Sequence, residues 1–417
     1  MAVRLCSSKT PTAMSIEKIL TTIIARISVK HKWQSDFLYE IFDLIFSIQG
    51  RLTFENLARY SPKSERTFRR NFKKFFDWLD FNWQLFVLFA NAEQGTVIGA
   101  IDCSYIPKAG KVTYGLDRFF SGAAGRAKKG LEISLLCLIN TLDKKAWSLD
   151  VSQTPAGLSA KQVDTQQLTR VDHYMDQLKN AQTKLAGVQY FVADGFYAKD
   201  KVFECIDQLG KDLITKLRPD ANLRYLYQGG PTGKPGRPLQ YDGKVIWKEL
   251  DLNQWDYIGT DTKYEYLEIY TQVLNSPRFK RNFRVVMVVN TKSNKYILLA
   301  CTDQGLDART ILFYYQLRFK IEFLFRDAKQ FCGLTHCQAR SKEALHFHFN
   351  LSLAAVNVAQ VKLKLDPAIK SMNVFVRKAY NLRLVKSLFS QLSSEVEFDL
   401  NRIEVQRVIA TGTSNYS

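Results

Sequence analysis

The sequence predicts an α/β protein, in which a mixed sheet with helices is interrupted by a β-rich insertion and flanked by helical N-terminal and C-terminal regions. Short apolar runs at 96–101, 131–139, 146–151 and 188–193 have the length of buried strands. Residues 16–24, 37–46 and 345–364 carry apolar side chains at helical spacing. Residues 219–290 are rich in turn formers and strand formers, which predicts the insertion.

Composition favours a polyanionic partner. The chain has 417 residues with 59 Lys and Arg against 40 Asp and Glu, a formal net charge of +19. Basic side chains that neutralise phosphates release condensed counterions, so nucleic acid is the expected partner. No apolar run approaches the roughly 18 residues of a membrane span, and no export signal is evident. The seven cysteines are scattered without paired spacing, which fits a reducing cytosol.

Residues 1–95 are expected to form a helical DNA-binding domain with a helix-turn-helix at about 52–78. The first helix covers 52–60, residues 61–63 form the break, and Ser64 caps a second helix that reaches Trp78. Residues 51–74 hold eight basic and two acidic side chains. The expected DNA contacts are Arg66, Arg69, Arg70 and Lys73. A surface helix whose aromatic face enters the core explains the same pattern, and the charge favours DNA.

The predicted core covers 96–218 and 291–365, and two of its strands end in aspartates. The run 96–101 ends at Asp102, and 188–193 ends at Asp194. Carboxylates at the ends of neighbouring strands meet at one edge of a sheet. The order strand, strand, strand, helix, strand, helix resembles the ribonuclease-H-like fold. Residues 219–290 form the insertion, and 366–417 a helical C-terminal region.

A third carboxylate lies on the helix expected over 314–329. At about 100° per residue, the polar side chains on this helix share one face, and apolar side chains occupy the other. The polar face consists of Tyr315, Arg318, Glu322, Arg326 and Lys329. A solvent-facing, salt-bridged surface is the alternative interpretation for a single helix.

The spacing Tyr315-x2-Arg318-x3-Glu322-x6-Lys329 resembles the YREK signature of DDE transposases from bacterial insertion sequences, in the cut-and-paste branch. The segments 101–104 and 193–197 resemble that family's two aspartate sites, and Ser104 supplies the small hydroxyl two positions after the first aspartate. The resemblance implies that Glu322 is the third catalytic metal ligand. It also implies that Tyr315, Arg318 and Lys329 contact DNA phosphates, and we expect neighbouring Arg326 to do the same.

The implied chemistry is phosphodiester cleavage by two Mg²⁺ ions per site, with Mn²⁺ able to substitute, held by Asp102, Asp194 and Glu322. The implied partners are DNA, as transposon ends and target, and a second protomer in a homodimeric end-paired complex, with 371–392 as the candidate contact. No membrane is expected, and the implied location is the bacterial cytoplasm at the nucleoid.

Two residues of the insertion complete the expected DNA contacts. Arg237, in a loop of Gly, Lys and Pro, resembles the arginine of a minor-groove hook, although a plain surface loop explains it as well. Trp255, in an expected loop, is the candidate for stacking on a flipped base, and a core position is the alternative.

Two other functions remain open. One is a DNA-binding protein that keeps the fold without catalysis, and the other is a ribonuclease-H-like nuclease that acts on RNA. The three carboxylates favour an enzyme, and the helix-turn-helix with the large insertion favours DNA.

Overall fold

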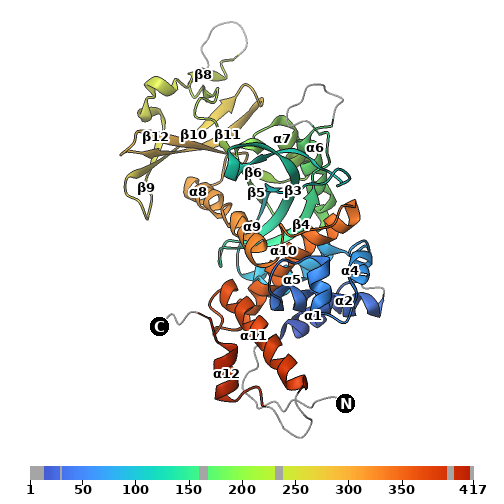
Figure 1. Cartoon of the computed structure of the whole chain (residues 1–417). Coiled ribbons are helices and arrows are strands. Elements are labelled where there is room, and N and C mark those ends of the chain that lie inside the picture. The colour runs from blue at the N-terminus through green and yellow to red at the C-terminus, as the bar shows by residue number, and fades with distance from the viewer. Residues whose placement is uncertain (1–13, 29–30, 159–167, 231–237, 392–398, 414–417) are drawn as a thin grey trace.

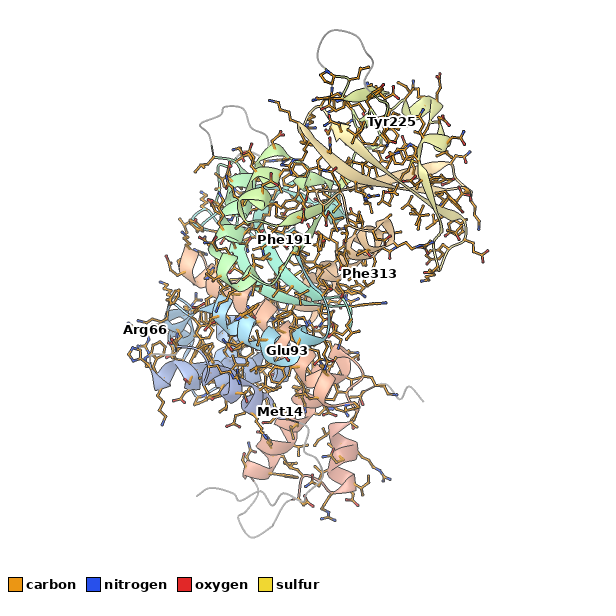
Figure 2. The ribbon with its side chains drawn as sticks, turned by 180° about the vertical axis from the view of Figure 1, so that it is seen from behind. Met14, Arg66, Glu93, Phe191, Tyr225 and Phe313 are labelled. Carbon is orange, nitrogen blue, oxygen red and sulfur yellow. The ribbon has the colours of Figure 1, made fainter. Side chains whose placement is uncertain are left out.

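The computed structural model describes residues 14–28, 31–158, 168–230, 238–391 and 399–413. A central sheet lies between a helical end and a β-rich end (Figure 1). Figure 2 shows the same division from behind, with Arg66 at the helical end, Phe191 in the middle and Tyr225 at the β-rich end. No helix in the described ranges is long and apolar enough to cross a membrane.

The N-terminal region is helical, as the apolar spacing predicts. Its helices are α1 (Ile16–Ile24), α2 (Lys32–Ser47), α3 (Phe54–Arg59), α4 (Glu65–Asn71) and α5 (Trp78–Phe89). Ser64 caps α4 by accepting from the backbone N–H of Thr67. The prediction that this helix reaches Trp78 is wrong, because α4 ends at Asn71 and Trp78 begins α5 behind its own cap, Asp77.

The aromatic side chains after Ser64 explain this break. Phe68, Phe72 and Phe76 are buried, whereas Phe75 is 83% exposed. Phe72 contacts the ring of Phe347 in the core, with the ring centroids 4.7 Å apart. The chain therefore leaves helical geometry after Phe72 while it keeps these rings in the core. The cations of α4 remain on the outside.

The central sheet has the predicted mixed topology. Its strands are β1 (Val97–Ile106), β3 (Arg126–Asn140), β4 (Lys145–Gln153), β5 (Tyr190–Ala193) and β6 (Asp212–Leu217), in the order β4-β3-β1-β5-β6. The β1, β3 and β4 pairings are antiparallel, and β5 pairs in parallel with β1 and β6. β2 (Asp117–Ser121) pairs with the outer part of β3. Helix α6 (Arg170–Asn180) connects β4 to β5, and helix α7 (Asp200–Gln208) connects β5 to β6. This arrangement confirms the ribonuclease-H-like α/β fold.

The later helices are α8 (Ala308–Leu317), α9 (Lys320–Phe331), α10 (Lys342–Leu365), α11 (Met372–Gln391) and α12 (Ile403–Ile409). Helix α10 seals the outer edge of β4. The Asn350 amide donates to the carbonyl of Val151 and the Asn357 amide to that of Ser148, while both side-chain oxygens accept from the N–H groups of the same two residues. An uncovered strand edge leaves backbone groups unpaired, and these buried amides satisfy them.

The strands between 219 and 301 extend the same sheet. They are β7 (Arg224–Leu226), β8 (Tyr241–Lys244), β9 (Asp256–Thr260), β10 (Leu267–Ser276), β11 (Arg281–Asn290) and β12 (Lys295–Cys301). β12 pairs with β6, and the order continues through β11 and β10 to β7 and β8. β8 ends at Lys244, and a 3₁₀ turn begins at Trp247.

Candidate active site

Asp102 lies within a strand and not at its end, which corrects the sequence prediction. β1 continues to Ile106, and Asp102 faces Leu135 of β3 across the antiparallel ladder. On the other side, β1 pairs with β5 at Gly99 and Ala100. A Cβ on Gly99 would lie 2.3 Å from the ring of Phe191, so only glycine allows β5 to approach this closely. β1 thus carries Asp102 past the point where β5 stops.

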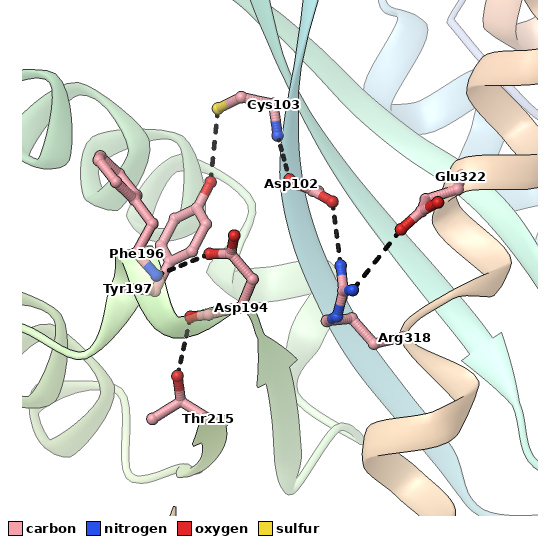
Figure 3. Close-up of polar contacts among 8 residues, drawn as sticks. All are labelled: Asp102, Cys103, Asp194, Phe196, Tyr197, Thr215, Arg318 and Glu322. Atoms are coloured by element: carbon pink, nitrogen blue, oxygen red, sulfur yellow. Dashed lines mark hydrogen bonds and ion pairs between the residues drawn. The ribbon is translucent and has the colours of Figure 1, made fainter. Parts of the chain in front are cut away.

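Asp194 follows the last residue of β5, as predicted. Its carboxylate accepts from the N–H of Phe196 at 2.9 Å. Its carbonyl accepts from the hydroxyl of Thr215 on β6 at 2.8 Å. These two bonds fix the turn, so that the carboxylate lies beside Asp102 (Figure 3).

Glu322 comes from a helix that is interrupted, and not from the single helix that the sequence predicts. α8 ends at Leu317 and α9 begins at Lys320, while the N–H groups of Arg318 and Phe319 bond to carbonyls three residues back. This tighter turn changes the phase between the two helices. Arg318 then lies between two carboxylates, with Nη1 3.1 Å from Asp102 Oδ2 and Nη2 3.6 Å from Glu322 Oε1 (Figure 3).

The surroundings of Asp102 oppose its ionisation. Burial and the nearby Asp194 raise the pKa of Asp102 to about 6, although Arg318 opposes the shift. The guanidinium of Arg318 therefore does not fully offset the effects of burial and Asp194 on Asp102. Arg318 is itself incompletely satisfied, because its buried Nε has no hydrogen-bond acceptor within the described residues.

The remaining polar residues of the 314–329 segment fall into two groups. Lys329 donates to the hydroxyl of Ser104 at 2.8 Å, which ties α9 to β1 two residues beyond Asp102. The Tyr315 ring lies near the Arg318 guanidinium, and burial raises the pKa of its phenol. Arg326 is exposed, pairs with Asp327 at 2.9 Å and lies over the Phe323 ring. The structure brings Tyr315, Arg318 and Lys329 close to the carboxylates, whereas Arg326 makes its described contacts with Asp327 and Phe323.

The donor set suits a hard divalent cation. Carboxylate oxygens are the ligands that Mg²⁺ prefers, and the uncompensated charge around Asp102 is what a cation would offset. In the described arrangement, no three Asp, Glu, His or Cys side chains stand close enough together to hold one ion. Arg318 occupies the space between Asp102 and Glu322 instead.

The sequence was then compared with known proteins. Residues 27–263 match the family described as DDE superfamily endonuclease, which is more than half of the chain. The chain belongs to this family. The match contains Asp102 and Asp194, and Glu322 lies beyond it.

Two solved structures are also similar to this DDE endonuclease. They are a pre-cleavage Mos1 transpososome and a Mos1 transposase paired-end complex with the left transposon end. Each aligns with 50% of this chain and 60% of its own, at 11% identity and a TM-score of 0.16. This chain therefore spans less than two thirds of their length. A comparison with curated proteins gives no match.

The DDE endonuclease presents the predicted N-terminal cations at its surface. Arg66, Arg69, Arg70 and Lys73 are all exposed on α4 or just after it. Arg69 pairs with Glu65. Figure 2 shows Arg66 at the outer edge of the helical end.

The structure describes only one of the two residues predicted to contact DNA in the insertion. Arg237 lies outside the described residues. The prediction that Trp255 is free to stack on a base is wrong, because its side chain is 5% exposed and its Nε1 donates to the hydroxyl of Tyr225. Trp255 follows a 3₁₀ turn and precedes β9, which places the ring in the core of the insertion.

Several residues that sequence reasoning missed support the DDE endonuclease site. The N–H of Cys103 donates to Asp102 Oδ1 at 2.8 Å, and its thiol contacts the Tyr197 hydroxyl at 3.4 Å. Lys199 lies near Asp194, with Nζ 3.6 Å from the centre of the Phe196 ring. In the sequence, these residues are distinguished only by lying a few positions after Asp102 or Asp194. Many residues with a purely structural role lie equally close to an aspartate.

Proposed function

We propose that this DDE endonuclease is a DNA transposase of the cut-and-paste, YREK-bearing kind found in bacterial insertion sequences. It binds element ends, cleaves them by two-metal phosphodiester hydrolysis, and joins the 3′-hydroxyl ends to target DNA. The observation that carries the proposal is that Asp102, Asp194 and Glu322 come together from three separate elements. Arg318 pairs with Asp102 and Glu322, and Asp194 lies close enough to Asp102 to raise its pKa. The family is endonucleolytic, which supports the reaction class.

Asp102, Asp194 and Glu322 are the residues that would hold the metal ions. Bound Mg²⁺ or Mn²⁺ would activate the attacking oxygen and stabilise the leaving one. The carboxylates supply hard oxygen ligands and orient them through the bonds from Cys103 and Phe196. Asp102 must lose its proton to act as a ligand, and its raised pKa makes that step sensitive to mildly acidic pH.

Arg318 has two successive roles in this proposal. In the described arrangement its guanidinium pairs with Asp102 and Glu322. Its second role would be to bind a DNA phosphate once it no longer pairs with these carboxylates. Its buried Nε, which lacks an acceptor within the described chain, supports this second role. Lys329 and Tyr315 lie beside it and would contact the same backbone.

The other regions have proposed roles of their own. Residues 1–95 bind the element end through α3 and α4, and 96–218 with 291–365 form the catalytic core. Residues 219–290 are the β-rich insertion, and 366–417 supply the contact between two protomers in the end-paired complex. The protein then acts on DNA at the bacterial nucleoid, in the cytoplasm.

The test uses a supercoiled plasmid that carries the gene with its natural flanking DNA. The parental protein should nick and cut it at the element boundaries when Mg²⁺ or Mn²⁺ is present. Asp102→Ala, Asp194→Ala and Glu322→Ala should each reduce cutting by a factor of at least about 10³, the scale of losing a group that stabilises the transition state. Binding of an end fragment should stay within a few-fold, because separate cations hold the DNA.

Asp327→Asn is the matched control. It changes a carboxylate on α9 that pairs with Arg326 and lies outside the site, so cutting should persist. A triad variant that cuts at the parental rate would remove that residue from the site. Parental protein that binds but never cuts would favour the binding-only alternative, and cutting of RNA alone would favour the nuclease.

A further inference from the structure

A groove separates α4 from the catalytic core. Its volume is about 940 Å³, and its walls come from α4, the loop after β1 and the segment that leads into α10. The charged side chains that line it are Arg69, Lys73, Lys108 and Arg340. All four are cations, and no carboxylate is among the lining residues that the structure describes.

These cations are only partly compensated. Glu65 pairs with Arg69, and Glu343 lies close enough to Lys73 to interact with it. The side chains of Lys108 and Arg340 have no acidic partner in the described ranges, and Lys108 donates to the carbonyl of Cys337. Burial lowers the pKa of Lys108, and nearby Arg340 lowers it further. Two adjacent cations without a counter-charge favour the binding of an anion.

The groove continues the line of β1 away from the catalytic carboxylates. Asp102, Ser104 and Lys108 follow one another along this strand and the loop after it, and Lys329 is held at Ser104. Strand β1 ends at Ile106, so six positions at up to about 3.3 Å per residue put Lys108 no more than roughly 20 Å from Asp102. DNA rises about 3.4 Å per base pair, so this limit corresponds to roughly six base pairs. Arg318, Lys329 and Lys108 would therefore mark one path.

We propose that the groove binds the sugar-phosphate backbone of the DNA being cut, within about six base pairs of the scissile phosphate. The inference rests on the proposed function and adds Lys108 and Arg340 to the DNA-binding residues. Ammonium and guanidinium groups recognise phosphate through charge and hydrogen bonds and do not distinguish bases. The contact would fix the position of the duplex relative to the carboxylates, whatever its sequence.

The first test compares a Lys108→Ala, Arg340→Ala double variant with Lys111→Ala. Lys111 is an exposed lysine on the same loop that does not line the groove. The plot of log affinity for an end fragment against log salt should become shallower by about two for the double variant and should not change for Lys111→Ala. Circular dichroism spectra and melting curves should show that both variants are folded. An unchanged slope in the double variant would overturn the proposal.

The second test neutralises single phosphates with methylphosphonate linkages along the end fragment. In the parental protein, neutral linkages at one or two positions about three to six base pairs from the cut should weaken binding. In the double variant the same linkages should have no further effect, because the partner cations are gone. A side chain with a merely structural role would not produce this position-specific coupling.

The two proposals can fail separately. If the parental protein cuts with Mg²⁺ but the neutral linkages have no effect at these positions, the groove assignment is wrong and the transposase proposal stands. If the parental protein neither binds nor cuts the end, the proposed function fails first. Unchanged DNA binding together with lost binding of a polyglutamate peptide would instead assign the groove to an acidic protein segment.

Discussion

At the residue scale, Asp102 is a carboxyl group whose environment opposes its ionisation. Its pKa is raised to about 6 by burial and by Asp194, so the folded state binds a proton more tightly than the unfolded state does. The stability that comes from this proton is fully present below pH 4 and is lost as pH rises through about 6. At neutral pH the ionised group therefore lowers the free energy of unfolding by roughly 2 to 3 kcal/mol. Catalytic groups commonly carry such a cost.

The neutral variant Asp102→Asn should therefore unfold at a higher temperature than the parent in metal-free buffer at pH 7.5. The expected gain is up to about 2 kcal/mol, reduced by the loss of the partner of Arg318. At pH 4 the difference should disappear, because Asp102 is then protonated. Differential scanning calorimetry with a chelator present measures both values.

Asp172 provides the opposite case for comparison. Burial raises its pKa, but hydrogen bonds from Lys201 and Thr169 outweigh burial and lower it. Asp172→Asn should therefore destabilise the protein at pH 7.5 by about 1 kcal/mol, since it weakens the capping box of α6. If Asp102→Asn and Asp172→Asn lower the free energy of unfolding by the same amount, the environment of Asp102 does not oppose its ionisation.

At the element scale, the close pairing of β1 with β5 decides where the two aspartates meet. Gly99→Ala would place a methyl group 2.3 Å from the buried ring of Phe191. Relieving that clash should cost about 1 to 3 kcal/mol of unfolding free energy and separate the strands next to the site. We expect a lower melting temperature together with slower DNA cutting.

Gly187→Ala is the matched control for this substitution. Gly187 lies in the turn before β5, and a Cβ there would have no neighbour within 4 Å. Its melting temperature and cutting rate should match the parent within error. Equal effects at both positions would mean that the contact between Gly99 and Phe191 does not set the strand spacing.

At the scale of the whole molecule, the net charge of +19 and the exposed cations of α4 predict strong salt dependence of DNA binding. If six or more phosphates are neutralised, affinity for an end fragment should fall by a factor of about 10³ or more between 50 and 200 mM salt. Arg66→Ala and Arg70→Ala should each reduce the slope of log affinity against log salt concentration by about one. Fluorescence anisotropy over a salt series measures this, and a flat response would argue against a DNA-binding role for α4.

The C-terminal helices are the proposed surface for a second protomer. Leu384 and Leu388 lie one turn apart on α11 and are 48% and 55% exposed. Leu384→Asp with Leu388→Asp should abolish end pairing while a single end still binds.

A second assay mixes Glu322→Gln protomers with protomers that cannot bind an end. If this mixture never cuts, the active site does not act in trans.

The sequence by itself was sufficient to predict most of the strands and helices and to single out the three acidic residues of the candidate site. Apolar runs and their spacing were sufficient for the central strands, for β5 ending before Asp194 and for the long helix α10. Local periodicity depends on near neighbours, so it can be read along the chain. The spacing from Tyr315 to Lys329 likewise singled out Arg318, Glu322 and Lys329, and all three lie at or beside the site.

Only the tertiary structure decided the contacts that depend on distant packing. The break at Arg318 and Phe319, the continuation of β1 past Asp102 and the early end of α4 all follow from partners far away in the sequence. Trp255 has the local sequence of a loop residue, yet a hydrogen bond to Tyr225 and the surrounding core bury it. The groove at Lys108 and Arg340 exists because segments more than 200 residues apart meet there. Burial and long-range proximity are properties of the folded chain, and no local pattern encodes them.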